Sequence, residues 1–580
     1  MDLTETIKAQ RLKHITALLL LCLVMFLPGL SNFPVIDRDE ARFAQASVQM
    51  AESGDLLDIK FQEDKRYKKP AGIYWLQTAT IKVFSSDGER KIWAQRLPSV
   101  LGGILAVLAT YWGAARMIGR RGAFIAASLL GVSALVVFES HIAKTDAMLL
   151  GLSTLCFGTL AHLRHGGGAK SAWLFWIALG FSIMIKGPIT PILVSLSLIT
   201  LAIWERKNGW MKAFLNVPAI LVFLIIWVPW AITMWVTTDG AFFVESVGKD
   251  FSGKLISTQE RHSGPPGYYF GFIWLTLWPS CLLLLPAFAF AIRAVKNGKE
   301  SDAAVVKAMR LCLAWVLPYW ALIEFMPTKL PHYALPLFPA LCVMAGAAAL
   351  TLFAVREFSV LRRINAVIYF ITSAVLITLI MAAQTLYGGD KQMLTYAVYG
   401  IGGAAGLAAV IASFGLWQAK MQLTLISAGL SAVILSVATY QFIMPNLTTL
   451  RVTDQIVKTL EAQNIALPRQ GGVEIISPHF TEPSLVYRLG TSIDVTDRAN
   501  LLDMSKLAKG RIIILDYQRK DGEKMMGEIR RSATQAGICT KTAPTFQGIN
   551  YSKGDDVEIA IIRAVNCPSE APNAQSQPSE

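Results

Sequence analysis

The chain has 580 residues, of which 53% are hydrophobic and only 16% are charged. A soluble core could not bury that much apolar surface, so the composition excludes an ordinary soluble protein and indicates many membrane spans. The net charge of +14 could suggest a nucleic-acid partner. The lysines and arginines, however, separate apolar runs and form no continuous basic patch, which argues against nucleic acid.

Long apolar runs predict about thirteen transmembrane helices. We interpret the first run as a retained span, because no small-residue cleavage site separates it from the charges that follow. The predicted spans lie near residues 15–36, 97–115, 123–140, 146–163, 172–186, 188–204, 214–236, 271–292, 308–326, 333–354, 364–386, 393–416 and 422–443.

Lysine and arginine counts predict the orientation of these spans. The N-terminus and every second loop are basic and are therefore expected in the cytoplasm. The loops on the opposite side, above all 37–96 and 237–270, mix acids, bases, histidines and aromatic residues. The active face is accordingly expected on the outer side, where glycines and prolines make 237–270 a candidate lid.

The composition becomes that of a soluble protein after residue 445. We expect 1–445 to be the membrane domain, 446–567 a small extracytoplasmic α/β domain and 568–580 a disordered tail. Predicted strands cover 473–476, 485–487, 511–515 and 557–564, and predicted helices cover 453–463 and 524–535. Cys539 and Cys567 fall in this exported domain, where an oxidising compartment would allow a disulfide.

Acidic and basic side chains are concentrated where the first span ends. Asp37 and Glu40 have the spacing of a capping box, which is a purely structural role. Asp39 and Arg42 share a helix face and could form a surface ion pair of little energetic value. A carboxylate beside an arginine also stays ionised, as a catalytic base requires.

A basic run at 65–69 follows in the same loop, with an aromatic amphipathic segment at 73–76 directly after it. Such a segment is typical of a helix lying at the membrane surface, and its lysines could simply reach toward the headgroups. The same arrangement could seat a lipid-linked phosphate.

The order of these residues resembles the first outer loop of the bacterial aminoarabinose transferases and protein O-mannosyltransferases. These are GT-C glycosyltransferases that use a polyprenyl-phosphate sugar. The resemblance extends over about 15–445 and rests on these motif residues: Asp39, Glu40, Arg42, Gly54, Asp55, Lys69, Pro70, Tyr74, Trp75, Arg96, Pro98, Ser99, Asp146, Lys329, Pro331, Tyr333, Pro336 and Pro339. It implies an all-α polytopic membrane domain of GT-C type followed by a small α/β domain.

The resemblance also implies site residues and partners. Asp39 would be the catalytic carboxylate and Asp146 the second acid. The donor would be a polyprenyl-phosphate sugar, and the acceptor a glycolipid such as lipid A or another glycan, at the periplasmic face of a bacterial inner membrane. Contacts to substrate are expected from Glu40, Arg42, Lys68, Lys69, Lys329 and Tyr333.

Two departures concern a metal. Aminoarabinose transferases carry a metal-binding glutamate just before the lysine that matches Lys69, and this chain has Lys68 there. No histidine occurs around Gly248 to Asp250, where the partner ligand is expected; His262 is a weak substitute. No cofactor is therefore certain: a divalent metal stays open as an alternative, but its usual ligands are replaced.

Three other functions remain open at this stage. A protein O-glycosyltransferase would use the same donor. A transporter or flippase of a lipid-linked sugar would need broken, polar helices near the membrane midplane, for which 186–188 is the main candidate. An assembly protein would use 446–567 to bind a partner.

Overall fold

The computed structural model describes residues 3–86, 89–205, 209–256, 263–298, 303–354, 358–389, 391–495, 499–565 and 567. The chain divides into two compact units. The membrane unit comprises Met1–Pro34, Ala46–Ser86 and Lys91–Asn446, and the C-terminal unit comprises Val35–Gln45, Asp87–Arg90 and Leu447–Glu580. The boundary between them falls inside helix α2 (Asp39–Ser53).

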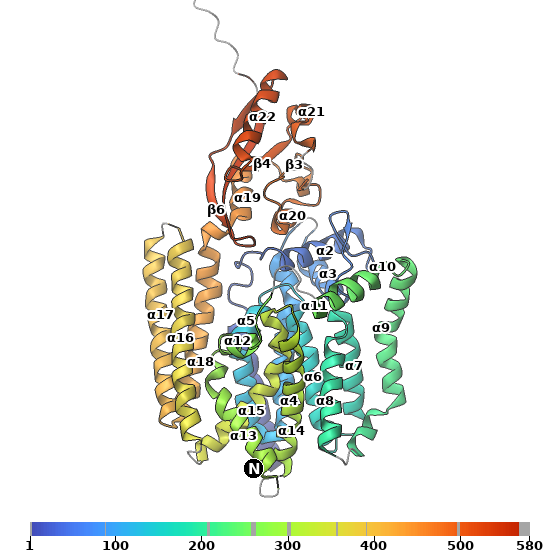
Figure 1. Ribbon diagram of the computed structural model, residues 1–580, viewed down its shortest axis with the longest axis vertical. Coiled ribbons are helices and arrows are strands. Elements are labelled where there is room, and N and C mark those ends of the chain that lie inside the picture. Colours follow the sequence, from blue (N-terminus) through green and yellow to red (C-terminus); the bar gives the residue numbers. More distant parts are fainter. Residues whose placement is uncertain are drawn as a thin grey trace, which may run out of the picture. The chain divides into compact units, whose positions relative to one another are not determined.

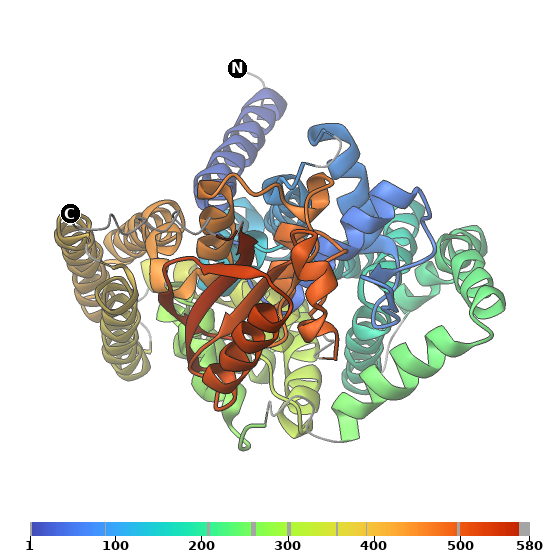
Figure 2. The same cartoon turned by 90° about the horizontal axis from the view of Figure 1, so that it is seen from above.

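Long apolar helices make up the membrane unit (Figure 1). They are α1 (Leu3–Phe26), α4 (Ile92–Val132), α5 (Ala134–Ser140), α6 (Asp146–Arg164), α7 (Ala169–Lys186), α8 (Ile189–Trp204), α9 (Val217–Thr237), α12 (Tyr268–Thr276), α13 (Leu284–Lys296), α14 (Ala303–Phe325), α15 (Phe338–Ala354), α16 (Ser359–Tyr387), α17 (Gln392–Trp417) and α18 (Met421–Val437). Helices α16, α17 and α18 group on one side of the unit and α9 lies on the other (Figure 2).

Within the described residues, ten helices are long and apolar enough to cross a membrane, or eleven if the bent pair formed by α12 and Ser280–Lys296 is one span. Helix α4 folds back on itself at Gly119, whose φ is 74°, and this brings Val107 beside Gly131. Counting its two halves separately, and including the shorter α8, gives every one of the thirteen predicted spans a helical counterpart.

Small residues let α4 and α6 approach closely. A side chain at Gly102 would lie 2.5 Å from the Ala147 backbone, and one at Gly113 would lie 2.6 Å from the Gly158 Cα. Close backbone approach through small residues is a common way for membrane helices to associate. The contact at Ala147 fixes the start of α6, and therefore the position of Asp146.

Shorter elements lie between the spans. In the first outer loop these are the hairpin of β1 (Lys60–Phe61) and β2 (Asp64–Lys65) and helix α3 (Gly72–Phe84), which is the expected amphipathic segment. The second large loop contains α10 (Ala241–Phe243), the π-helix Val244–Phe251 and α11 (Ser252–Ile256).

A five-stranded sheet forms the core of the C-terminal unit. The strand order is β3 (Ile475–Ile476), β4 (Ile512–Asp516), β7 (Asp555–Val565) and β5 (Cys539–Thr542), with β6 (Phe546–Asn550) also paired to β7. Only β3 and β4 are parallel. The helices are α19 (Val452–Ala462), α20 (Pro483–Leu489), α21 (Met504–Ala508) and α22 (Gly522–Gln535), and α22 packs on the sheet through Met526 and Ile529.

One predicted strand is wrong. Residues 485–487 lie in the helix α20, which has Pro483 in its first turn and Gly490 directly after its end. Proline at the start and glycine past the end are the favoured helix boundaries, so the sequence did carry the correct signal. All three residues are buried, and a short apolar run fits a strand or a buried helix equally well.

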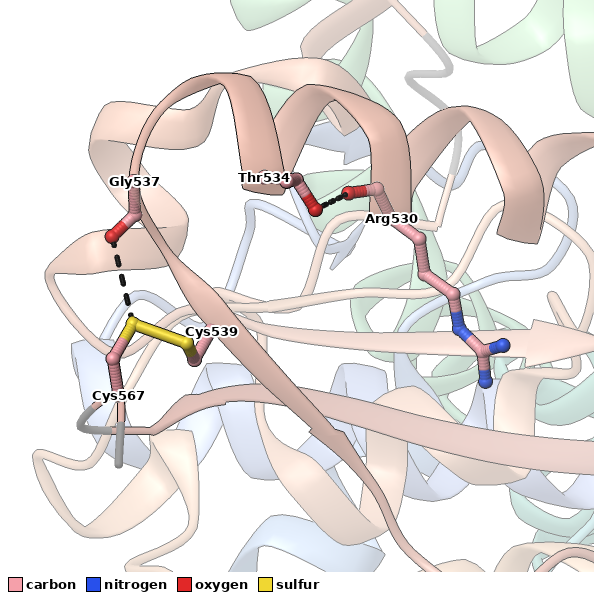
Figure 3. Close-up of a disulfide and its surroundings, with 5 residues drawn as sticks. All are labelled: Arg530, Thr534, Gly537, Cys539 and Cys567. Atoms are coloured by element: carbon pink, nitrogen blue, oxygen red, sulfur yellow. Dashed lines mark hydrogen bonds between the residues drawn. A yellow bond between two sulfur atoms is a disulfide. The ribbon is translucent and has the colours of Figure 1, made fainter. Parts of the chain in front are cut away.

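The expected disulfide is confirmed. Cys539 at the start of β5 is bonded to Cys567, which follows β7, with 5.1 Å between their Cα atoms (Figure 3). The other five cysteines are buried as free thiols.

Candidate functional site

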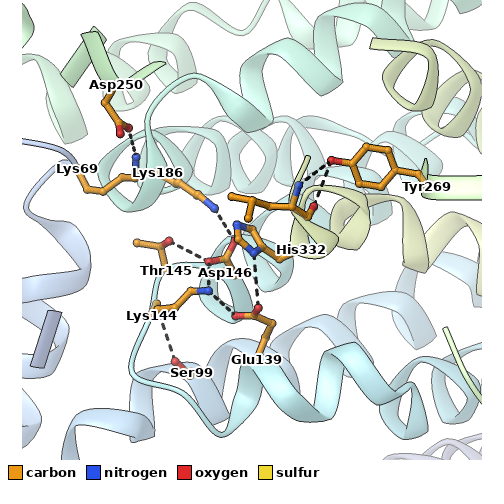
Figure 4. Close-up of polar contacts among 11 residues, drawn as sticks. Lys69, Ser99, Glu139, Lys144, Thr145, Asp146, Lys186, Asp250, Tyr269 and His332 are labelled. Carbon is orange, nitrogen blue, oxygen red and sulfur yellow. Dashed lines mark hydrogen bonds and ion pairs between the residues drawn. The ribbon is translucent and has the colours of Figure 1, made fainter. Parts of the chain in front are cut away.

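The candidate site in the membrane unit is centred on the Asp146 carboxylate, at the first residue of α6. Lys186, the last residue of α7, places its ammonium 2.5 Å from Asp146, and Lys144 lies 3.6 Å away (Figure 4). The Asp146 side chain is only 4% exposed. A buried carboxylate needs such partners, and the N-terminus of a helix stabilises its negative charge further.

His332 connects this carboxylate to a second one. Its imidazole lies 3.9 Å from Asp146 and 4.0 Å from Glu139, and Lys144 is 3.5 Å from Glu139. His332 is held in a 3-10 helix (Pro331–Leu337), while Glu139 comes from the end of α5. Five ionisable groups from four segments therefore meet in one cluster.

Lys69 forms a second ion pair in the same unit. Its ammonium lies 2.5 Å from Asp250 in the π-helix, and Asp250 also pairs with Lys254 at 2.7 Å. Burial lowers the pKa of Lys69 to about 8, with Lys254 and Lys186 adding to the effect and Asp250 opposing it. Burial alone would raise the pKa of Asp250, but the two lysines outweigh it and lower that pKa.

The two groups of charges are neighbours. The charge on Lys186 acts on Lys69, and Figure 4 shows Lys69 with Asp250 beside Lys186 and Asp146. Lysines are the most numerous charged residues of the two groups together, and they come from α7, α11, the first outer loop and the turn before α6. Clustered cations in a site partly shielded from water are suited to stabilise a phosphate that gains charge.

Lys329, an expected substrate contact, lies against the end of helix α14. It is only 4% exposed, and its ammonium donates to the carbonyls of Ile323 (3.1 Å) and Glu324 in the last turn of α14. Burial lowers its pKa, against the effect of Glu324. Carbonyls at a helix end lack partners within the helix, so Lys329 caps the end of α14, and its contact to substrate stays a prediction.

The tyrosine next to the cluster has a defined setting. Tyr333 is half-buried and stacks edge-on against His332, with 5.1 Å between the ring centroids. The Tyr269 hydroxyl supports the same turn, because it lies 3.2 Å from both the carbonyl oxygen and the amide nitrogen of Leu330. Lys68, beside Lys69, is exposed.

Asp39, Glu40 and Arg42 belong to the C-terminal unit. Asp39 is exposed, Arg42 is half-buried and Glu40 is buried. The expected capping box is wrong: Glu40 accepts a hydrogen bond from the Ile36 amide at 2.8 Å, whereas the Asp37 carboxylate accepts one from Ser484. The left-handed backbone of Arg38, with φ 68°, explains why α2 begins only at Asp39.

No group of three or more histidine, cysteine or acidic side chains suited to a metal occurs among the described residues. His262, the weak metal candidate, lies outside them. At the position beside Lys69 where the resemblance implies a metal ligand, this chain has the exposed Lys68, and Lys69 is paired with Asp250.

Sequence reasoning assigned no role to several charged residues of the site, which are Glu139, Lys144, Lys186, Asp250, Lys254 and His332. His332 lies in the same short segment as Lys329 and Tyr333, which were assigned roles. Lys186 had a signal of its own, a lysine at the end of an apolar run, and Asp250 was noted only as a loop charge. His332, Lys186 and Asp250 each acquire their role from a partner more than 80 residues away or on another helix.

Known proteins resemble this chain in sequence and in fold. Residues 68–235 match the family model described as dolichyl-phosphate-mannose-protein mannosyltransferase. The undecaprenyl phosphate-alpha-4-amino-4-deoxy-L-arabinose arabinosyl transferase of Pseudomonas aeruginosa is 25% identical over 333 residues, which cover 56% of this chain and 57% of that protein. Its namesake in Aeromonas hydrophila is 26% identical over 392 residues, 65% of this chain and 68% of that one. The alignment with the Pseudomonas protein thus spans little more than half of its length.

Two solved structures share the fold. ArnT from Cupriavidus metallidurans, crystallised with undecaprenyl phosphate, has a TM-score of 0.68 at 17% identity and covers 95% of this chain and 98% of that chain. The archaeal oligosaccharyltransferase AglB from Archaeoglobus fulgidus has a TM-score of 0.50 at 11% identity and covers 98% and 75%. The resemblance expected from the first outer loop is confirmed: the chain has the GT-C fold and is similar in sequence to aminoarabinose transferases and to the protein mannosyltransferase family.

Proposed function

We propose that this protein is an integral membrane glycosyltransferase that moves a sugar from polyprenyl phosphate to an envelope glycolipid such as lipid A. The observation that carries the proposal is the buried cluster of lysines around Asp146 and Asp250, in a GT-C fold. The relatives' activity suggests the donor class, undecaprenyl phosphate with an amino sugar. The acceptor class follows from the family resemblance.

The orientation is part of the proposal. Basic residues in alternate loops support a cytoplasmic N-terminus, with the first outer loop and 446–567 in the periplasm of a bacterial inner membrane. The disulfide between Cys539 and Cys567 supports the same placement, because disulfides persist in oxidising compartments. The domain limits proposed are 1–445 for the membrane part and 446–567 for the periplasmic part, with a tail at 568–580 outside the described residues.

The reaction breaks the bond between the sugar C1 and the phosphate oxygen of the donor, and forms a bond from C1 to an acceptor oxygen. Lys69 stabilises the departing phosphate, assisted by Lys68 and Arg42. Asp39 takes the proton of an acceptor hydroxyl as general base. If the acceptor is itself a phosphate, it needs no base, and Asp39 orients it instead. Polyprenyl phosphate is the second product.

Asp146 has a structural role in this proposal and does not act as the general base. Lys186 and Lys144 pair with it and His332 lies beside it, so it anchors the cations rather than abstracting a proton. Glu40 supports the loop through Ile36, and Tyr333 lines the cluster through His332.

The test is transfer from a radiolabelled polyprenyl-phosphate sugar to lipid A by the purified protein in detergent. Asp39→Asn should abolish transfer with expression intact, while Asp64→Asn, an exposed acid of the same loop, should not. Lys69→Ala should chiefly raise the KM for the donor, while Lys65→Ala, whose side chain is 50% exposed, should not. Full activity of both Asp39→Asn and Lys69→Ala would refute the assignment, and flipping without transfer would favour a transporter.

A protein acceptor is the second candidate, favoured by the mannosyltransferase family match at 68–235. Mass spectrometry of envelope glycolipids and glycoproteins, with and without the protein, separates the two. Loss of a sugar from lipid A alone supports a glycolipid acceptor, and loss from glycoproteins alone supports a protein acceptor.

A further inference from the structure

The segment that carries Asp39 belongs structurally to the far end of the chain. Val35–Gln45 clusters with Leu447–Glu580 and not with the membrane helices that flank it in sequence. This segment lies between α1 and the part of α2 that belongs to the membrane unit. The assignment of its residues to the C-terminal unit therefore needs specific contacts to explain it.

Hydrogen bonds of Asp37 and Arg38 attach the segment. The Asp37 amide donates to the Tyr551 hydroxyl at 2.7 Å, and the Asp37 carboxylate accepts from the Ser484 amide at 2.8 Å. The Arg38 guanidinium donates to the Ser552 carbonyl at 2.6 Å. Both the backbone and the side chains of the two residues preceding Asp39 are therefore held.

The receiving surface is itself fixed. Ser484 lies in the first turn of α20, and Tyr551 and Ser552 lie in the turn between β6 and β7. Glu482 links these two places, because it accepts a hydrogen bond from Asn550 at 2.8 Å and lies 3.5 Å from the Lys553 ammonium. The segment thus docks on a site that the C-terminal unit builds from two of its own elements.

The backbone on either side of Asp39 depends on this docking. Arg38 has φ 68°, a conformation that residues with a Cβ rarely adopt and keep only where their surroundings impose it. On the other side, Glu40 turns back to the Ile36 amide at 2.8 Å. Asp39 therefore stands between two constrained residues, and its direction follows from theirs.

We propose that the C-terminal unit is a positioning module for Asp39, and that Asp37 and Tyr551 are positioning residues for the transfer reaction. This inference rests on the proposed function, in which Asp39 is the base. It gives the C-terminal unit a part in the chemistry through geometry, with no contact of its own to the substrate. Burial raises the pKa of Asp37 to about 7, against the hydrogen bonds from Ser484 and Tyr551, which agrees with a docked and shielded carboxylate.

The test uses the full-length protein in lipid nanodiscs. Tyr551→Phe removes only the hydroxyl that accepts from Asp37, and because Tyr551 is 43% exposed the change leaves the core intact. Tyr517→Phe is the matched control, since Tyr517 packs on the core of the same unit. We expect kcat to fall on the order of tenfold in Tyr551→Phe with the donor KM unchanged, because small displacements of a catalytic group cost rate rather than binding.

Asp37 supplies a second pair of variants. Asp37→Ala should lower kcat more than Tyr551→Phe, and Asp37→Asn should restore much of it, since its amide oxygen can still accept from Ser484. Asp503→Ala is the control, because Asp503 accepts backbone hydrogen bonds in its own helix α21. Hydrogen exchange of 35–45 should quicken in Tyr551→Phe and Asp37→Ala, and stay as in the wild type in both controls.

Wild-type kcat and wild-type exchange of 35–45 in Tyr551→Phe and Asp37→Ala would overturn the inference. The exchange measurement needs no substrate, so it separates this inference from the proposed function. A wild-type protein without transferase activity refutes the proposed function, whereas an active wild type with indifferent variants refutes only the positioning role.

Discussion

Asp250→Asn is the sharpest perturbation of the candidate site, because it removes one charge and little volume. Asp250 is the acidic neighbour that supports the protonated form of Lys69, at 2.5 Å, and it also separates Lys69 from Lys254. In the variant the Lys69 ammonium faces burial, Lys254 and Lys186 without this compensation. Its pKa must therefore fall below the value of about 8 found in the intact protein.

The size of the effect follows from the geometry. An opposite charge within hydrogen-bonding distance shifts a pKa by about 1–3 pH units, and the partial exposure of Lys69, 20%, favours the lower half of that range. A fall from about 8 to about 6.5 reduces the protonated fraction at pH 7.4 from about 0.8 to about 0.1. Donor binding that needs the charged lysine should weaken about sevenfold at that pH.

The assay is the KM for the polyprenyl-phosphate sugar between pH 6 and 9. The wild type should lose affinity as the pH rises past about 8, because Lys69 then deprotonates. In Asp250→Asn this alkaline loss should move about one to two pH units toward acid. Glu245→Gln is the matched control: its pair with Lys249 is in the same loop, at 2.5 Å, but is exposed, so the profile should keep its wild-type position.

A profile that stays in place in Asp250→Asn, or that moves toward alkali, would refute this reasoning. The first result would mean that the charge of Lys69 does not govern donor binding. The second would mean that Asp250 competes with the donor phosphate for Lys69 and does not support it.

Three further outcomes are expected. Asp37→Asn should stabilise the protein at pH 8 by at most about 4 kcal/mol, measured by thermal unfolding. The pKa of Asp37 is raised from 3.8 to about 7 in the folded protein, so ionisation of this carboxyl destabilises the wild type as the pH rises toward and through 7. A variant less stable than the wild type at pH 8 contradicts this. Replacing Cys539 and Cys567 by serine should cost the C-terminal unit about 3–4 kcal/mol, measured by denaturant unfolding, since the bond closes a loop of 28 residues. Lys186→Gln should destabilise the membrane unit by about 3–5 kcal/mol and lower transfer, because it leaves Asp146 buried beside fewer cations; an unchanged melting temperature contradicts it.

The membrane helices could be predicted from the sequence because length and apolarity decide them locally. Each predicted span has a helical counterpart, although two of the predicted spans lie in the single helix α4, which is broken at Gly119. The segment 485–487 shows where prediction from apolarity alone fails. A three-residue apolar run has no periodicity of its own, whereas Pro483 and Gly490 mark the boundaries of a helix.

The site was only partly predictable, for a different reason. Lys69 and Asp146 stand in motifs, whereas their partners Asp250 and Lys186 are chosen by tertiary packing across 181 and 40 residues. The contacts of Lys329 were unpredictable for the same reason. A sequence shows an ammonium near the site, but cannot say whether it turns toward a ligand or toward the end of α14.

The long range of the Asp37 contacts has a consequence for biosynthesis. Asp37 leaves the ribosome 447 residues ahead of Ser484 and 514 residues ahead of Tyr551. Domains otherwise fold in the order of their translation, but this segment must wait for the last quarter of the polypeptide to be exported. In a nascent or truncated chain that lacks Ser484 and Tyr551, the segment around Asp37 is undocked, and we expect transfer activity only after these residues have been made.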